Sequence, residues 1–189
     1  MPIDDGRTQL ERMRAGDLYR ADDPEIVAAA RRARRLQDRY NVTRADEDDE
    51  RRHLLGQLLG AFGTGSEVRP PFFCDYGSHI RIGARVFANF GLVALDVATI
   101  TVGDDVQIGP NVQLLTATHP VDADLRRAKW ESGAPITIGA NVWLGGGAIV
   151  LPGIGIGDDT VVGAGAVVTR DLPAGVVAVG NPARVVRSV

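Results

Sequence analysis

Residues 136–171 read ITIGANVWLGGGAIVLPGIGIGDDTVVGAGAVVTRD and carry an aliphatic side chain at every sixth position. That aliphatic series is Ile138, Leu144, Val150, Ile156, Val162 and Val168. A second series of small or aliphatic residues falls four positions later in each step: Val142, Ala148, Ile154, Thr160 and Ala166. Glycine directly follows four members of the first series. The region is therefore an internal repeat with a period of six residues, and such a repeat is strong evidence of a solenoid.

A period of six fits neither an α-helix, with about 3.6 residues per turn, nor the two-residue alternation of a strand. It fits a short strand followed by a sharp corner, for which glycine is suited. Three such sides make a triangular coil of about eighteen residues, and successive coils stack about 4.8 Å apart by parallel backbone pairing. An irregular glycine-rich sandwich is the alternative, but it would not keep this phase over six steps. We therefore predict a mainly β protein built as a coil stack.

Length and composition suit one folded domain with an appendage. The chain has 189 residues, is 44% hydrophobic and has a formal net charge of −3, so neither nucleic acid nor an acidic membrane is an expected partner. The one cysteine, Cys74, excludes an intramolecular disulfide. No apolar run reaches the roughly 20 residues of a membrane span, and no signal-peptide pattern opens the chain. We expect a cytoplasmic protein.

Residues 1–65 predict an N-terminal helical segment. Thr8 and Glu11 have the spacing of a capping box, and Gly16 would end the first helix. Asp23 and Pro24 fit the N-cap and first position of a second helix. An acidic run at 46–50 favours the start of a third helix, which Leu55, Leu58, Leu59 and Phe62 would continue. We expect all three helices to pack on the coil stack and cover its first open edge.

Residues 66–189 predict the coil stack, with two interruptions. The six-step pattern begins at Ile80 and shifts by two residues before Val102, which an insertion at 95–99 would explain. The pattern then stops at Leu114 and resumes at Ile138. Residues 116–135 are therefore expected to form a loop ejected from the coil wall, and loops of this length in compact folds are usually functional or disordered. A last strand at 176–179 and a short tail complete the chain.

His119 and Asn89 are the residues best suited to chemistry. His119 is the only histidine in the ejected loop, and an imidazole, with a reference pKa of about 6.5, can accept a proton near neutral pH. A histidine bonded to backbone is the structural alternative. Asn89 lies between two aromatic residues where the repeat is irregular, so its amide could bind a substrate hydroxyl or a developing oxyanion. A left-handed corner residue is the alternative, and spacing alone does not separate the two.

Carboxylates and arginines form further candidate groups. Asp75 and Asp96 lie near irregular points of the repeat and could accept hydrogen bonds from sugar hydroxyls or cap turns. Arginines are concentrated near the C-terminus, where acidic residues are scarce, so this region could bind phosphate and pyrophosphate groups. The alternative is that these arginines are only solvated. These arginines are Arg170, Arg184 and Arg187.

Two other chemistries are disfavoured by the sequence. Cys74 follows two phenylalanines and is expected to be a buried apolar residue rather than an acyl-carrying nucleophile. A zinc site is also not expected, because His53, His79 and His119 are the only histidines and no two of them are close in sequence.

The chain resembles the maltose and galactoside O-acetyltransferases, with the nodulation-factor acetyltransferases nearby. The resemblance extends over nearly the whole chain through AGDLYR at 15–20, CDYG at 74–77, FANF at 87–90, LDV at 95–97, TATHP at 116–120, NVWLG at 141–145, GAGAVVTRD at 163–171 and GNPA at 180–183. The repeat alone indicates only the hexapeptide-repeat acyltransferases; the helical N-terminus together with the His-Pro loop is much more specific. The first, second, fourth and fifth of these segments favour the maltose type over the galactoside type.

The resemblance implies a left-handed parallel β-helix with an N-terminal helical segment. It also implies that His119 is the catalytic base and that Asn89 assists the transition state. Substrate-binding positions would be Asp75, Asn89, Asp96 and Trp143. Positions that hold coenzyme A would be Gly146, Ala164, Thr169, Arg170, Arg184 and Arg187. A serine of the galactoside enzymes is Gly146 here, a lysine is Arg170, and a second acid is Val97. An N-terminal acidic contact would fall at Asp22 or Asp23.

The function that follows is direct transfer of acetyl from acetyl-CoA to a sugar hydroxyl, with a maltose- or glucose-type acceptor and the 6-hydroxyl as the expected position. The family forms homotrimers with sites between adjacent coils, and no metal is expected. Two alternatives remain open. One is O-acetylation of another acceptor, such as an antibiotic or an amino-acid hydroxyl. The other is a non-catalytic coil that presents a glycan-binding wall.

Overall fold

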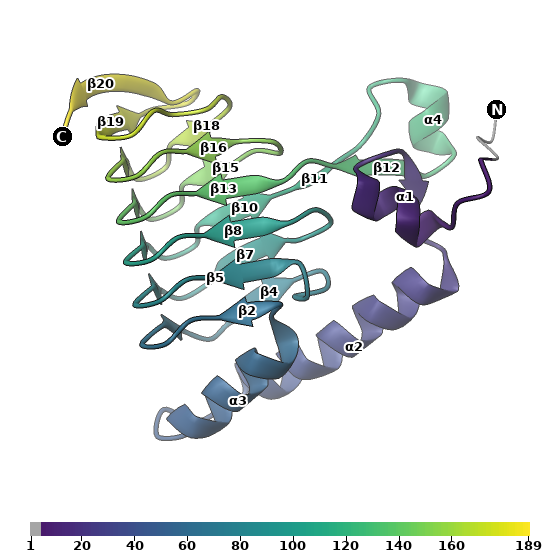
Figure 1. Ribbon diagram of the computed structural model, residues 1–189, viewed down its shortest axis with the longest axis horizontal. Helices are drawn as coiled ribbons and strands as arrows, with labels where there is room; N and C mark the ends of the chain where they lie inside the picture. Colours follow the sequence, from purple (N-terminus) through teal and green to yellow (C-terminus); the bar gives the residue numbers. More distant parts are fainter. Residues whose placement is uncertain (1–4) are drawn as a thin grey trace.

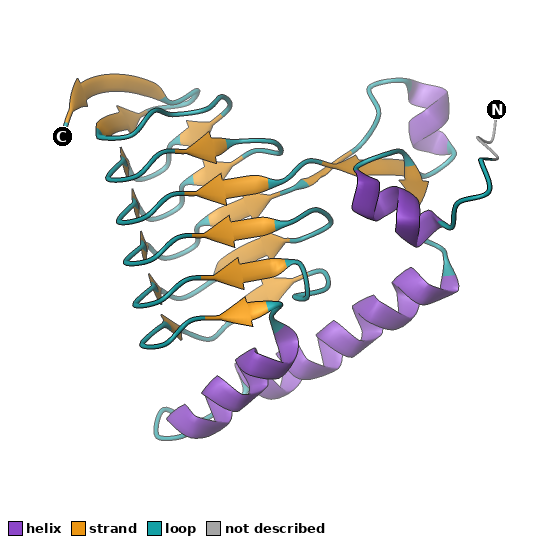
Figure 2. Ribbon diagram, in the orientation of Figure 1, coloured by secondary structure: helices purple, strands orange, loops and turns teal. Residues whose placement is uncertain are grey.

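The structure, a computed structural model that describes residues 5–189, is a three-sided parallel β-helix with helices across one end and beside one edge (Figures 1 and 2). Each coil contributes one short strand to each of three parallel sheets, here called faces 1, 2 and 3 in the order in which the chain visits them. Face 1 holds β2 (Ala61–Phe62), β5 (Ile80–Ile82), β8 (Ile100–Val102), β13 (Ile136–Ile138) and β16 (Gly155–Ile156). Face 2 holds β3 (Glu67–Val68), β6 (Phe87–Ala88), β9 (Gln107–Ile108), β14 (Trp143–Leu144), β17 (Val161–Val162), β19 (Val176–Val179) and β20 (Arg184–Ser188). Face 3 holds β4 (Phe72–Cys74), β7 (Leu92–Leu95), β10 (Gln113–Leu115), β15 (Ile149–Val150) and β18 (Val167–Val168).

The interior of the β-helix confirms the six-residue repeat. Every member of both series between residues 138 and 168 is buried, most of them fully. The one polar member, Thr160, donates a hydrogen bond of 2.7 Å from Oγ1 to the carbonyl of Pro173, so its burial leaves no hydroxyl unpaired. Corners between faces 1 and 2 place non-glycine residues in the left-handed region, among them Arg85, Asp105 and Asn141.

The helical segment begins as predicted. Helix α1 (Gln9–Ala15) has Thr8 and Glu11 in a capping box and ends at Gly16 with a φ of 76°. Helix α2 (Pro24–Asn41) starts after Asp23, whose carboxylate accepts the N–H of Glu25. The two candidates for an N-terminal acidic contact have different partners: the Asp23 carboxylate caps α2, whereas Asp22 forms an exposed ion pair with Arg20.

Helices α2 and α3 (Asp48–Leu58) cover the first coil, as predicted (Figure 1). The Gln37 amide bonds the backbone of Cys74 at 2.8 and 3.0 Å, and the Asn41 amide bonds that of Phe72 at 2.8 and 2.9 Å. The fully buried Tyr40 hydroxyl donates to the carbonyl of Val68. Side chains of α2 therefore satisfy backbone groups on the open end of the β-helix.

Two expectations for this segment are wrong. The third helix ends at Leu58, and Phe62 belongs to strand β2, so the β-helix begins before residue 66. Directly after α3 the backbone N–H of Gly60 bonds the carbonyls of Gly77 and Ile80, so the chain has already joined the first coil at that point. A Cβ at Gly60 would lie 2.3 Å from the carbonyl oxygen of Ser78, so only glycine fits there. Helix α1 does not cover the first coil either; it lies beside the ejected loop (Figure 1).

The ejected loop leaves the edge where face 3 meets face 1, and it has its own structure. It contains β11 (Ala117–Thr118), α4 (Ala123–Arg127) and β12 (Trp130–Gly133). Strand β12 pairs antiparallel with β11 on one side and with β1 (Tyr19–Arg20) on the other. The expected insertion before β8 is found at the same edge, because Val102 follows Ala94 by eight positions whereas their in-register counterparts, Ile156 and Val150, are six positions apart.

The tail forms β20, which the repeat did not predict. It turns back at Gly180 and pairs antiparallel with β19 of the same chain (Figure 2). The tail thereby covers the last open coil on face 2.

Candidate functional site

We call the edge where face 3 meets face 1 the loop edge; it carries Asp75, Asp96, His119, Thr169 and Arg170. Asp75 follows β4, Asp96 follows β7, and the loop with His119 follows β10 one coil further on. Thr169 and Arg170 follow β18 at the same edge, and both are exposed. Parallel stacking therefore aligns five predicted site residues along one side of the molecule.

Asp96 supports this edge from inside. It is fully buried, and its carboxylate accepts backbone N–H groups from Asp75 at 3.1 Å, Tyr76 at 2.8 Å and His79 at 3.1 Å. Burial raises the pKa of the Asp96 carboxyl, while these N–H donors oppose that rise. The sequence predicts that Asp96 contacts the acceptor. In the structure its carboxylate is buried and instead holds the corner that carries Asp75.

Asp75 lies in an acidic surrounding. The side chain is half-buried, and its pKa is raised to about 6, first by desolvation and then by the negative charges of Asp96 and Glu131. The buried phenols of Tyr19 and Tyr76 face the same group of carboxylates, and desolvation raises their pKa values. The half-buried Asp75 carboxylate is the member of this group that can accept hydrogen bonds from a polar ligand, because the two phenols are buried.

His119 is exposed and follows β11 directly. No hydrogen bond or ion pair of its ring is found within residues 5–189, so the alternative of a loop histidine bonded to backbone does not hold in this chain. Its ring nitrogens can reach a ligand that binds along the loop edge.

We call face 2 together with its edge toward face 3 the tail side; it carries Asn89, Trp143, Gly146, Ala164, Arg184 and Arg187. Asn89 follows β6 and does not have a positive φ, which removes the left-handed corner alternative. Its Oδ1 accepts the N–H of Phe90 at 2.8 Å, so Nδ2 is the atom offered to a ligand. The guanidinium of Arg69 lies over the rings of Phe87 and Phe90, 4.9 and 5.2 Å from their centroids.

Backbone N–H groups at Gly146 and Ala164 form the middle of the tail side. The two residues stack on adjacent coils, where the N–H of Gly165 donates to the carbonyl of Gly146 at 2.9 Å. Within residues 5–189 no acceptor lies against the N–H of Gly146 or Ala164. A Cβ at position 146 would lie 3.3 Å from Cδ of Pro110, so a side chain there would be tight.

Trp143, Arg184 and Arg187 share the outward side of face 2. Trp143 is 56% exposed and pairs in register with Val161, which pairs with Val177, which pairs with Arg187. Arg184 pairs with Val179 on the same side. The two guanidinium groups bond only to carbonyls of Ala183 and Ser188, and neither forms an ion pair within the described chain. Their charges can therefore meet an anion.

The loop edge and the tail side are separated by face 3, so one subunit does not bring His119 and Asn89 together. A hollow of about 800 Å³ does exist in the single chain, but it lies between α3 and the first coil, beside Arg52 and Phe90. None of the predicted site residues lines it. A site that uses both groups requires the loop edge of one molecule to face the tail side of another.

Two further features bear on the chemistry: the Cys74 thiol and the side chains that could hold a metal ion. Burial raises the pKa of the Cys74 thiol, with smaller contributions from Asp96 and Asp75, so the thiolate is disfavoured. Among residues 5–189, no group of three or more histidine, cysteine or acidic side chains is placed to hold a metal ion.

No helix in this part of the chain is both long and apolar enough to span a bilayer.

Known protein families match both parts of this chain, the N-terminal helical segment and the β-helix. Residues 12–63 match the maltose acetyltransferase hexapeptide capping motif, and residues 135–170 match the hexapeptide repeat of succinyl-transferase. Nodulation protein L of Rhizobium meliloti (strain 1021) is 52% identical over 179 residues, which cover 95% of this chain and 98% of that protein. This chain belongs to the maltose and galactoside O-acetyltransferase family.

Solved structures support the same assignment. A maltose O-acetyltransferase from Clostridium difficile 630 superposes with a TM-score of 0.96 at 45% identity, covering 97% of this chain and 98% of the other. A galactoside acetyltransferase in complex with coenzyme A superposes with a TM-score of 0.93 at 40% identity, covering 96% and 91%. The expected fold of this acetyltransferase, a left-handed parallel β-helix with an N-terminal helical segment, is thus confirmed.

Tyr19, Glu131 and Arg69 lie near the candidate residues, and the sequence analysis does not predict this. Tyr19 lies in the AGDLYR segment that marked the family, but no local pattern shows that it meets Glu131, 112 residues away. Arg69 precedes the Pro70-Pro71 pair, and only the stacking of coils places it over Phe87 and Phe90, the aromatic residues on either side of Asn89 in the FANF segment.

Proposed function

We propose that this acetyltransferase moves acetyl from acetyl-CoA directly to a sugar hydroxyl, with sites formed between the subunits of a homotrimer. The observation that carries the proposal is the division of the site residues: an exposed, unpaired His119 on the loop edge, and the Asn89 amide with unpaired arginines on the tail side. In a closed ring each interface would join one loop edge to one tail side.

In this proposal the tail side binds the acetyl donor. Coenzyme A carries a pyrophosphate and a 3′-phosphate, which suit Arg184 and Arg187 from one subunit and Arg170 from its neighbour. The N–H groups of Gly146 and Ala164 would donate to the pantetheine amides, Thr169 would contribute a hydroxyl, and Trp143 would wall the cleft. The coenzyme A complex of the related galactoside acetyltransferase supports this ligand. Because acetyl-CoA is an intracellular metabolite, the proposal places the enzyme in the cytoplasm.

The proposed chemistry is one addition and one elimination. His119 accepts the proton of the acceptor hydroxyl while that oxygen attacks the thioester carbonyl, and Nδ2 of Asn89 donates to the resulting oxyanion. Collapse of the tetrahedral intermediate breaks the C–S bond, and the imidazolium returns its proton to the leaving thiolate. The products are an acetyl ester and free coenzyme A. The raised pKa of the Cys74 thiol supports direct transfer without an acyl-enzyme.

Asp75 would bind the acceptor. Its ionised carboxylate can accept hydrogen bonds from sugar hydroxyls, and Asp96 fixes the corner from which it projects. A maltose- or glucose-type acceptor, acetylated at the 6-hydroxyl, is the proposed substrate. Acylation of an antibiotic or amino-acid hydroxyl, and a non-catalytic glycan-binding coil, are the competing functions.

A thiol-release assay separates these functions. Acetyl-CoA is combined with maltose, glucose, a galactoside, serine or an aminocyclitol antibiotic, and free coenzyme A is followed with time. The proposal expects turnover with maltose or glucose that falls by at least about 10²-fold in His119→Ala. The control is His53→Ala, because His53 is an exposed histidine of α3 bonded to Gln57 and belongs to neither the loop edge nor the tail side. No turnover with any acceptor would contradict the proposal, and so would normal turnover in His119→Ala.

A further inference from the structure

The loop that carries His119 is held by a strand from the N-terminal segment. On its own the ejected hairpin has only two residue pairs between β11 and β12, Ala117 with Gly133 and Thr118 with Ser132. A two-stranded hairpin is marginally stable in water, and a third strand or a packed face is needed for stability. Strand β1 supplies that third strand by pairing Tyr19 with Glu131 and Arg20 with Trp130. His119 therefore follows the far strand of a three-stranded sheet.

Tyr19 is the central residue of this junction. It is fully buried, and its hydroxyl donates a hydrogen bond of 3.1 Å to Oε2 of Glu131 on β12. Its ring lies in a small apolar cluster apart from the main core. That cluster joins residues from α1, α2 and two corners of the loop edge: Met13, Tyr19, Ile26, Tyr76 and Val97. One side chain thus connects the helices, the hairpin and the β-helix.

The hairpin is also held at its base, where it leaves the β-helix at Thr116. The buried Thr116 hydroxyl donates to the carbonyl of Leu95 at 2.6 Å and accepts the N–H of Ala98 at 2.9 Å. A Cβ at Gly133 would lie 2.8 Å from Cγ1 of Val97, so the hairpin rests directly on the loop edge. With the root fixed, the remaining freedom of the loop lies at its outer part, which β1 restrains.

We propose that Tyr19 is a positioning residue for His119: through its bond to Glu131 and its packing, it holds the hairpin at the angle that catalysis needs. This inference rests on the proposed role of His119 as base. It gives the N-terminal segment a second task besides covering the first coil. A displacement of about 1 Å in a catalytic group can cost about 10²-fold in rate, so the loss of one anchoring bond should be visible in kcat.

The test compares Tyr19→Phe with Tyr40→Phe. Both residues are fully buried tyrosines whose hydroxyls donate one hydrogen bond, but Tyr40 bonds Val68 at the first coil, away from the hairpin. We expect Tyr19→Phe to lower kcat by about 10-fold with an unchanged KM for acetyl-CoA, and Tyr40→Phe to leave both constants near those of the parent. In Glu131→Gln an acceptor oxygen remains, so this variant should keep more activity than Glu131→Ala.

Hydrogen exchange gives a readout independent of catalysis. Peptides from residues 116–133 should exchange faster in Tyr19→Phe and Glu131→Ala than in the parent, and should be unchanged in Tyr40→Phe. Unchanged hydrogen exchange of these peptides in both Tyr19→Phe and Glu131→Ala would overturn the inference. Equal losses of kcat in Tyr19→Phe and Tyr40→Phe would also overturn it. If His119→Ala turns over normally, the proposed function fails, whereas the exchange data still report whether Tyr19 holds the hairpin.

Discussion

The backbone N–H of Tyr76 donates a hydrogen bond of 2.8 Å to Oδ1 of Asp96, one coil further along the β-helix. The N–H groups of Asp75 and His79 bond the same carboxylate, so one buried side chain satisfies three donors of a corner that has no strand partner. Asp96 thereby decides where Asp75 lies. The integrity of the loop edge depends on this carboxylate.

Asp96→Ala should destabilise the protein strongly. The substitution leaves buried N–H groups without acceptors, and each such group costs about 1–3 kcal/mol, so a loss of about 3 kcal/mol or more in the free energy of unfolding is expected. The control is Asp104→Ala, because the exposed Asp104 carboxylate also accepts a backbone N–H, from Ala84 at 2.8 Å. That variant should lose less than about 1 kcal/mol. Urea denaturation followed by circular dichroism measures both, and equal losses would contradict the role given to Asp96.

Asp75→Asn should stabilise the protein at neutral pH but not in acid. Because the pKa of folded Asp75 is raised to about 6 from 3.8, folding favours the protonated carboxyl. The stability that this group provides is complete below about pH 4 and is lost as the pH rises through about 6. The melting temperature of Asp75→Asn should therefore exceed that of the parent at pH 7.5, and the difference should shrink by pH 4.5. A difference that is constant over this range would show that Asp75 is not desolvated.

Cys74→Ala should keep at least about half of the parent's kcat. The thiol pKa is raised by burial, and direct transfer needs no thiolate. Intact-mass spectrometry of the parent, quenched during turnover, should show no acetyl adduct. An acetylated Cys74 peptide that forms and decays at the rate of turnover would overturn direct transfer.

Arg184→Ala and Arg187→Ala should each raise the KM for acetyl-CoA by about 10-fold, with less effect on the acceptor KM. A charge-assisted bond to a phosphate contributes about 1.5–3 kcal/mol, and neither guanidinium has an ion-pair partner in the described chain that would compete. Arg187→Glu should act more strongly than alanine because it adds repulsion. Titration calorimetry with coenzyme A measures the affinity directly.

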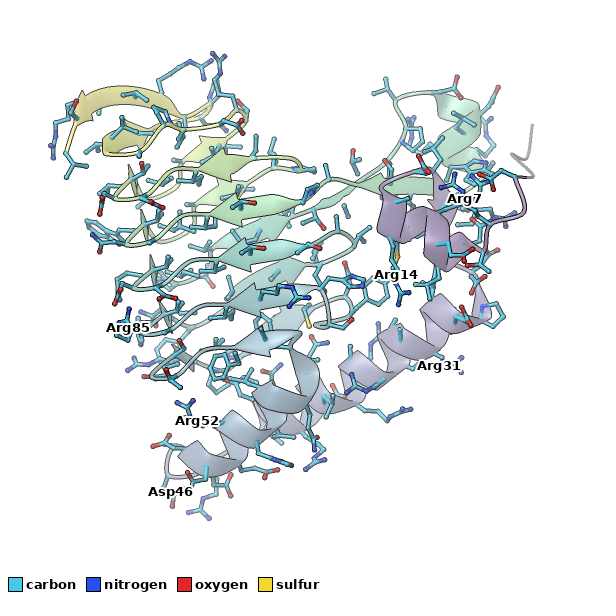
Figure 3. The ribbon with its side chains drawn as sticks, in the orientation of Figure 1. Arg7, Arg14, Arg31, Asp46, Arg52 and Arg85 are labelled. Carbon is cyan, nitrogen blue, oxygen red and sulfur yellow. The ribbon has the colours of Figure 1, made fainter. Side chains whose placement is uncertain are left out.

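Arg85→Ala is the matched control for these tail variants. Arg85 is also exposed, but it is paired with Asp105 at 2.6 Å and lies on the side of the β-helix opposite to the ejected loop (Figure 3). Coenzyme A affinity should not change in this variant. Equal affinities of the parent and the two tail variants would show that Arg184 and Arg187 are only solvated.

Much of this protein follows from local patterns in its sequence. The six-residue period predicted the buried series from Ile138 to Val168, because each short strand repeats the same inward position. The capping box at Thr8 and the Asp23-Pro24 pair predicted the starts of α1 and α2, because a helix N-terminus is satisfied by its own neighbours. The interruption after Leu114 located the loop that carries His119.

The tertiary structure alone decided how these parts meet. Phe62 pairs with Ile82 in the first coil instead of continuing α3, and the buried Asp96 accepts N–H groups from a corner of the neighbouring coil. Strand β1 pairs with β12 although Tyr19 and Glu131 are 112 residues apart. Hydrogen bonds and packing between distant segments leave no periodic trace in either segment, because each half of the contact is an ordinary residue until the other half is placed against it. Periodicity therefore determined the β-helix, while the placement of the candidate residues on two separate surfaces, the loop edge and the tail side, appeared only when the coils were stacked.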